Sequence, residues 1–196
     1  ETGILGADEL ENIDYDKYVF GDDQYGEFIG DPAVGFHAIV FGLPKGGKSI
    51  WSMQFANYLA NHFGKVLYIA SEEGFKGTIS QKIKEWTDNR TDLNFANFTG
   101  YDEIKENIKG YDFVFIDSLD FAKITVEEME ELKADNPTTS FVTVKQVTKD
   151  GKFRGSQEYA HNCDIIVEII EGIAHQKGRY SPISEMDVFN KAEEVE

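Results

Sequence analysis

The 196-residue sequence predicts an α/β protein of three layers, in which helices cover both faces of a mostly parallel β-sheet. Between residues 37 and 147, short apolar runs alternate with stretches of helical periodicity, a pattern typical of parallel strands joined by helices. After residue 163, strand-like runs follow one another with only short turns between them. Short turns join antiparallel strands, so we expect an antiparallel extension at one edge of the sheet.

The length predicts a single domain, and an acidic arm precedes it. We place the arm at residues 1–32 and the core at residues 33–196. The arm carries ten acidic side chains and one lysine, so its net charge is 1 − 10 = −9. Aromatic side chains are scattered through it, and two interpretations stay open. They pack on the arm's own domain, or they dock the arm on a neighbouring subunit.

The whole chain is also acidic, with 19 basic and 36 acidic residues and a net charge of −17. This charge argues against strong nonspecific binding of nucleic acid by an isolated monomer, but not against a local basic patch on an assembled ring or filament. No apolar run approaches the ~20 residues that span a bilayer, so we expect no membrane association. The single cysteine, Cys163, suits a reducing compartment, and we expect a cytoplasmic protein.

The strongest motif is a phosphate-binding P-loop between a strand and a helix. The segment Gly42–Ser49 (GLPKGGKS) fits G-x-x-x-x-G-K-[ST] without a mismatch. Before it, His37–Phe41 has the composition of a short buried strand, and after it Ser49–Phe63 has apolar residues near helical spacing. A strand, a glycine-rich turn and a helix N-terminus aimed at an anion form a complete phosphate site.

The residue types of the P-loop suit a nucleotide and its metal ion. Gly46 and Gly47 have no side chains, so their backbone N–H groups can close around phosphate oxygens. Lys48, which we expect to be solvated in a loop before the nucleotide binds, can reach the β- and γ-phosphates, and the Ser49 hydroxyl can bind Mg²⁺. The residues predicted to bind the nucleotide are Gly42, Pro44, Lys45, Gly46, Gly47, Lys48, Ser49 and Ile50.

The second predicted strand, Lys65–Ala70, ends in a pair of acids, Glu72 and Glu73. A carboxylate at this position could orient and deprotonate the water that attacks the γ-phosphate. The ordinary alternative is a solvated loop acid or a helix cap. Two adjacent acids leave the choice of a general base open on the residues alone.

The middle of the chain continues the alternation. A helix with Ile79, Ile83 and Trp86 on one face follows, and then a strand at Leu93–Phe98 and a helix at 102–109. The next elements are a strand at Asp112–Asp117, a helix from Thr125 to about Ala134 that opens with a capping box, and a strand at Ser140–Val147.

Two of these strands end in candidate site residues. Four apolar residues bury the strand that carries Asp117, so this carboxylate emerges at the carboxyl end, beside the P-loop of a parallel sheet. We predict that Asp117 and Ser49 hold Mg²⁺. Gln146, near the end of its own strand, could sense the γ-phosphate by a hydrogen bond, or it could be a buried and satisfied amide.

The last part of the chain has the pattern of three strands, Asp164–Ile170, Ala174–Tyr180 and Met186–Phe189. Lys177 and Arg179 alternate on the second of them, so both project from one face. They could be inserted into the nucleotide site of another subunit, or they could be a solvated pair that discourages edge-to-edge pairing. Composition does not separate the two interpretations.

With these motifs in place, the sequence resembles the RecA-like ATPase superfamily, and most closely its RadA and DnaB-type helicase branch. The resemblance covers about residues 30 to 190. It rests on five segments in the family's order: GLPKGGKS, YIASEEG at 68–74, VFIDSLD at 114–120, VKQVTKDGKFRG at 144–155 and HQKGRYSPISEMDVF at 175–189. The third looks like Walker B, and the fourth resembles a strand and loop that carry a γ-phosphate sensor and, in many members, contact DNA.

The resemblance also implies roles for individual residues. It makes Glu72, the first acid of its pair, the catalytic glutamate, and it makes Gln146 the sensor. Lys177 and Arg179 match a Lys-x-Arg finger that acts across a subunit interface. Two residues depart from the RadA pattern: Gly178 replaces an asparagine and Gln146 a histidine. The chain lacks the four-cysteine zinc module and protease-like domain of RadA proteins and the collar of the helicases, so we expect a stand-alone motor core.

The expected function is a Mg-dependent ATPase that assembles with copies of itself into a ring or filament. In the family that activity is coupled to DNA recombination, repair or replication, and single-stranded DNA is the expected partner. One alternative is a nucleotide-dependent protein scaffold of the clock or signalling type, which the acidic charge favours. Another is a small-molecule P-loop kinase, although only three arginines are present to build a phosphate-binding lid.

Overall fold

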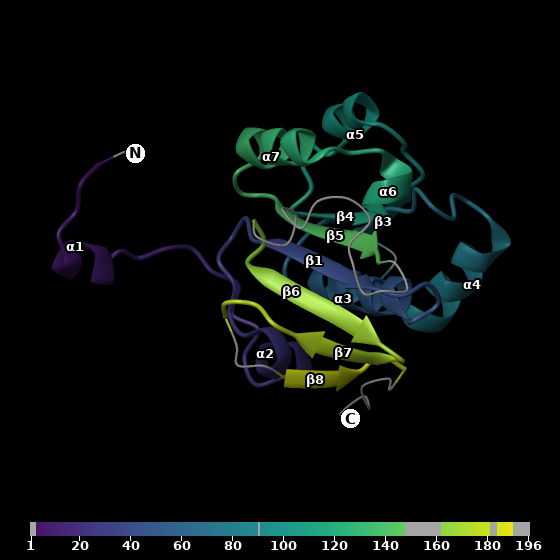
Figure 1. Ribbon diagram of the computed structural model, residues 1–196, viewed down its shortest axis with the longest axis horizontal. Coiled ribbons are helices and arrows are strands. Elements are labelled where there is room, and N and C mark those ends of the chain that lie inside the picture. The colour runs from purple at the N-terminus through teal and green to yellow at the C-terminus, as the bar shows by residue number, and fades with distance from the viewer. Residues whose placement is uncertain (1–2, 90, 148–161, 181–183, 190–196) are drawn as a thin grey trace.

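The computed structural model describes residues 3–89, 91–147, 162–180 and 184–189 (Figure 1). Its strands are β1 His37–Gly42, β2 Val66–Ile69, β3 Leu93–Ala96, β4 Phe113–Asp117, β5 Ser140–Gln146, β6 Ile165–Ile170, β7 Ile173–Gln176 and β8 Ser184–Asp187. Its helices are α1 Ala7–Glu11, α2 Gln24–Ile29, α3 Lys48–His62, α4 Gly77–Trp86, α5 Tyr101–Asn107, α6 Leu119–Ala122 and α7 Val126–Asp135.

The strands form one mixed sheet in the order β3-β2-β4-β5-β1-β6-β7-β8. All pairs from β3 to β6 are parallel, and β7 and β8 add to the β6 edge in antiparallel fashion. The predicted fold class, with its antiparallel C-terminal extension, is confirmed.

The sheet separates two hydrophobic clusters, because successive residues of each strand point to opposite faces. In β1, Val40 packs on the face that α3 covers, and Ile39 packs on the other. Figure 1 shows α5, α6 and α7 grouped on that second face. Among the described residues, β1, β2 and β4 are buried along their whole length, as expected for parallel strands covered on both sides.

The topology brings the predicted motifs to one edge of the sheet. β1 lies between β5 and β6, and β4 lies between β5 and β2. Parallel strands present their carboxyl ends on the same side, so the P-loop after β1, the acids after β2, Asp117 at the end of β4 and Gln146 at the end of β5 become neighbours.

The N-terminal region divides into two parts. Residues 3–17 are exposed, whereas Phe20, Tyr25, Phe28 and Ile29 are buried in the cluster around α3. Helix α2 begins at Asp23, whose side chain accepts hydrogen bonds from the N–H groups of the next turn. A bridge between Lys17 and Ala33 marks where the chain joins the body.

Several boundaries differ from the predicted ones. Helices α2 and α6 were not expected, because each is too short to show a helical period in the sequence. The strand predicted at 93–98 ends at Ala96, the one predicted at 174–180 is β7 at 173–176, and the one predicted at 186–189 is β8 at 184–187. None of the helices in the described ranges is both long and apolar enough to cross a bilayer.

Candidate functional site

A cleft of about 460 Å³ lies at the carboxyl ends of the parallel strands. Its walls include nine of the predicted site residues: Pro44, Lys45, Gly47, Lys48, Ser49, Ile50, Glu72, Asp117 and Gln146. Glu73, Lys82 and Phe189 complete it. The fold therefore collects in one hollow side chains that come from separate segments of the sequence.

The P-loop requires glycine at Gly47 for two reasons. Its φ is +104°, in the left-handed region that favours glycine, and a Cβ there would lie 3.1 Å from the Val188 side chain. Gly47 is also the N-cap of α3, so the free N–H groups of the first helical turn face the cleft region. Backbone of this shape at a helix N-terminus is suited to bind phosphate.

Lys48 is buried, which corrects the expectation of a solvated lysine. It is 7% exposed, begins α3, and its Nζ donates a hydrogen bond to the Leu43 carbonyl oxygen at 2.8 Å. Burial lowers the pKa of Lys48, and the nearby carboxylates of Asp117 and Glu72 partly oppose this. The sequence pattern could not show this folding-back, because it depends on how the loop closes over the helix.

Asp117 and Ser49 form a pair of oxygen donors at the base of the cleft. Asp117 is buried, and the Tyr68 hydroxyl donates to its Oδ2 at 2.7 Å. Burial raises the pKa of Asp117, whereas hydrogen bonds from Tyr68 and Ser49 lower it. A buried carboxylate beside a hydroxyl fits Mg²⁺, which takes hard oxygen ligands and is commonly held by one or two protein groups with substrate phosphates.

Glu72 and Gln146 face each other across the cleft. Gln146 Nε2 donates to both carboxylate oxygens of Glu72, at 3.1 Å each. Burial and the charge of Asp117 raise the pKa of Glu72, and the hydrogen bond from Gln146 lowers it. Glu72 is thus a carboxylate whose orientation is fixed by an amide, as a general base requires.

Glu73 has a different environment. It forms an ion pair with Lys82 of α4, which ties the loop after β2 to that helix. Both acids border the cleft, but a cation neutralises only Glu73 among the described contacts. The geometry therefore favours Glu72 over Glu73 as a base.

Phe189 is a wall of the cleft to which no sequence motif assigned a role. Its ring lies against Gly47 and Gly172, where side chains would collide with it, and it remains 51% exposed. The signal for it is three-dimensional. β8 folds back beside β7, and the Val188 N–H donates to the Gly172 carbonyl, which places Phe189 over the P-loop.

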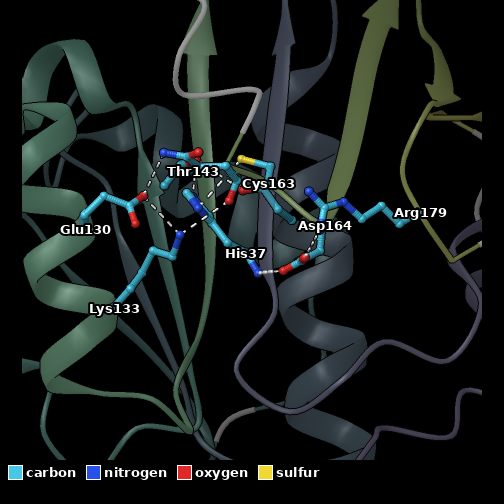
Figure 2. Close-up of polar contacts among 9 residues, drawn as sticks. His37, Glu130, Lys133, Thr143, Cys163, Asp164 and Arg179 are labelled. Carbon is cyan, nitrogen blue, oxygen red and sulfur yellow. Dashed lines mark hydrogen bonds and ion pairs between the residues drawn. The ribbon is translucent and has the colours of Figure 1, made fainter. Parts of the chain in front are cut away.

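Lys177 and Arg179 lie at the opposite end of the sheet from the cleft. The Arg179 backbone N–H donates to the Asp164 carbonyl, and its guanidinium lies 3.6 Å from the Asp164 carboxylate (Figure 2). Lys177 pairs with Glu168. Since β1 has six residues, this end is about 20 Å from the P-loop of the same chain. Neither cation can serve its own nucleotide site.

A second polar cluster, around His37, lies near Arg179 (Figure 2). His37 contacts Thr143 Oγ1 at 3.3 Å and Cys163 Sγ at 3.7 Å. Burial lowers the pKa of His37 to about 3 and raises that of Cys163 to about 12. Both groups are neutral at physiological pH, and a protonated thiol is a poor nucleophile. We assign this cluster to pairing across β1, β5 and β6.

Solved structures with the same arrangement identify the fold. The ATPase domain of a helicase superposes with a TM-score of 0.58 at 14% identity, covering 76% of this chain and 79% of that one. The chain has the RecA-like fold.

Two archaeal proteins support the same assignment. The flagellar accessory protein FlaH of Methanocaldococcus jannaschii has a TM-score of 0.61 at 9% identity and coverages of 86% and 88%. The KaiC-like protein PH0186 of Pyrococcus horikoshii OT3 has a TM-score of 0.63 at 12% identity and coverages of 88% and 93%. No family model matches the sequence, and comparison with curated proteins finds no match. The RecA-like fold predicted from the motifs is confirmed.

The segment expected to contact DNA lies largely outside the described residues. Of the stretch 144–155 that resembles the family's sensor strand and loop, the structure describes 144–147. Gln146 is therefore placed, and residues 148–155 are not.

Proposed function

We propose that this chain is a Mg-dependent ATPase that assembles with copies of itself and acts on DNA during recombination, repair or replication. The observation that carries the proposal is the cleft that joins the P-loop to Asp117, Glu72 and Gln146. A protein that binds ATP without hydrolysing it needs the P-loop and the metal-binding carboxylate. The oriented carboxylate of Glu72 is the addition that hydrolysis needs.

Each residue has a defined task in this proposal. Lys48 exchanges its bond to the Leu43 carbonyl for the β- and γ-phosphates. Ser49 and Asp117 would hold Mg²⁺, which neutralises charge on the phosphates when bound. Glu72 accepts the proton of the attacking water, and Gln146 keeps that carboxylate aligned.

Replacing the two acids separately tests which one is the base. Glu72→Gln is expected to bind ATP and to lose turnover by at least ~100-fold, because an amide cannot accept the proton. Glu73→Gln is the matched control and should be mild, since its carboxylate pairs with Lys82. Steady-state phosphate release at saturating ATP measures both. The reverse ranking would transfer the role to Glu73.

The pH dependence of turnover tests the link between Gln146 and Glu72. A base must be ionised, so kcat should fall as the pH drops through the raised pKa of Glu72. Gln146 stabilises the ionised form, so Gln146→Ala should raise that pKa further and move the acid limb to higher pH. An acid limb that stays in place, even with a lower kcat, would separate Gln146 from the proton transfer.

Phe189 is expected to stack on the adenine base, because an exposed ring borders the cleft beside the end of the P-loop. Stacking of a base on an aromatic ring contributes about 1–3 kcal/mol, so Phe189→Ala should weaken ATP binding about 5- to 150-fold. Binding of inorganic tripolyphosphate, which has no base, should not change. Equal losses for both ligands would mean that Phe189 only supports the P-loop.

A second candidate function is a nucleotide-dependent scaffold that binds a protein partner and no DNA. The net charge of −17 favours it, and a flagellar accessory protein and a KaiC-like protein share the fold. Filter binding of single-stranded DNA, with and without ATP at low and moderate salt, separates the two. The first candidate predicts ATP-dependent retention that weakens with salt. No retention in any condition would leave the scaffold.

A further inference from the structure

The N-terminal segment 3–16, here called the docking arm, presents exposed apolar side chains. Figure 1 shows it leading away from the body, with α1 near its end. The residues of the docking arm that are apolar and exposed are Ile4, Leu5, Leu10, Ile13 and Tyr15. The same segment contains five acidic residues and no basic one. An exposed acidic and apolar segment of this kind has the composition of a docking element.

A groove of opposite character lies along the outer surface of α4. It has a volume of about 380 Å³, and its walls are Phe75, Lys76, Ile79, Ser80, Ile83 and Lys84. Phe75 is 65% exposed. No carboxylate in the described part of the chain pairs with Lys76 or Lys84, and none of those described borders the groove. The groove therefore offers an apolar floor between two cations.

We propose that the docking arm of one copy of this chain binds in the α4 groove of a second copy. The apolar side chains of the arm would cover Phe75 and Ile83, and its acids would lie beside Lys76 and Lys84. The occupant is a second copy because the docking arm and α4 lie at opposite sides of the molecule and the arm leads away from its own body (Figure 1).

This contact joins two different surfaces, so it is heterologous and generates a closed ring or an open filament. The docking arm joins the body at Lys17, and Arg179 lies at the amino end of the sheet, whereas α4 follows the carboxyl end of β2 beside the cleft. Head-to-tail docking turns the Arg179 end of one copy toward the nucleotide site of the next. The value of this orientation, unlike the docking itself, rests on the proposed function.

Charge reversal on the full chain tests the docking. Sedimentation velocity should show self-association of the parent that strengthens with protein concentration and weakens with salt. Lys76→Glu with Lys84→Glu, and separately Asp8→Lys with Glu11→Lys, should each raise the dissociation constant at least about tenfold. Lys109→Glu, an exposed lysine of another face, is the matched control and should associate like the parent.

Mixing the two reversed chains gives the decisive result. Each has an arm and a groove of like sign, but an equimolar mixture offers opposite pairs of arm and groove and should assemble again. A parent that stays monomeric, reversed chains that associate as the parent does, or a mixture that stays monomeric would each overturn the proposal. ATP binding, measured on the same samples, is expected in all of them. Assembly without ATP binding would contradict the proposed function and support the docking.

Discussion

Arg179→Ala is expected to bind ATP as the parent does and to hydrolyse it about 10³-fold or more slowly. An arginine supplied by a partner contributes roughly 10³–10⁵ in rate where it has been measured. Arg179 is exposed and lies about 20 Å from its own P-loop, so it can meet the γ-phosphate only in a second copy. The parent's specific activity should accordingly rise with protein concentration.

A mixing experiment distinguishes a finger in trans from a structural role. Arg179→Ala has an intact P-loop, and Lys48→Ala has an intact Arg179. Their mixture should recover activity that neither chain has alone, because one kind of interface in it combines both intact groups. Activity that is independent of concentration, together with an Arg179→Ala chain as fast as the parent, would contradict the finger and leave Arg179 as the partner of Asp164.

Lys48→Ala is expected to weaken ATP binding at least about 100-fold and to abolish hydrolysis. Hydrogen bonds to a charged group contribute about 1.5–3 kcal/mol each, and Lys48 meets two phosphates. The fold should survive, because in the free chain the buried amine makes one described hydrogen bond, to the Leu43 carbonyl. Isothermal titration with ATP measures the affinity, and thermal unfolding followed by circular dichroism measures the fold.

Lys109→Ala is the control for this substitution, since it removes an exposed lysine that follows α5 and should change neither measurement. Parent-like hydrolysis by Lys48→Ala would mean that the phosphates bind elsewhere. Unfolding of Lys48→Ala would instead assign the lysine a structural task, and Ser49→Ala would then test the P-loop.

The sheet and the P-loop could be predicted from the sequence because their signals are local. Five apolar residues before Gly42 and the helical spacing after Ser49 are enough to define strand, loop and helix. Asp117 could be predicted for the same reason, since a buried strand ends at it. Parallel topology then supplied the neighbourhood of these residues without any knowledge of side-chain contacts.

What could not be predicted depends on contacts between distant segments. The burial of Lys48, the bond from Gln146 to Glu72 across 74 positions, and the ring of Phe189 over Gly47 all arise when the loops close. Alternation along a strand placed Arg179 beside Lys177 on one face, but only the antiparallel return of β7 shows that both lie away from the cleft. Short helices such as α2 depend on a cap and on burial, and neither produces a period in the sequence.

Single-turnover hydrolysis is the most direct test of the central claim that the cleft is a catalytic site. The parent chain, in excess over labelled ATP and at a concentration where it assembles, is compared with Glu72→Gln, with Mg²⁺ and with a chelator. We expect the parent to convert bound ATP to ADP only with Mg²⁺, and Glu72→Gln to retain ATP unchanged. A parent that binds ATP and leaves it intact with Mg²⁺ would contradict the claim and make the chain a nucleotide-dependent scaffold.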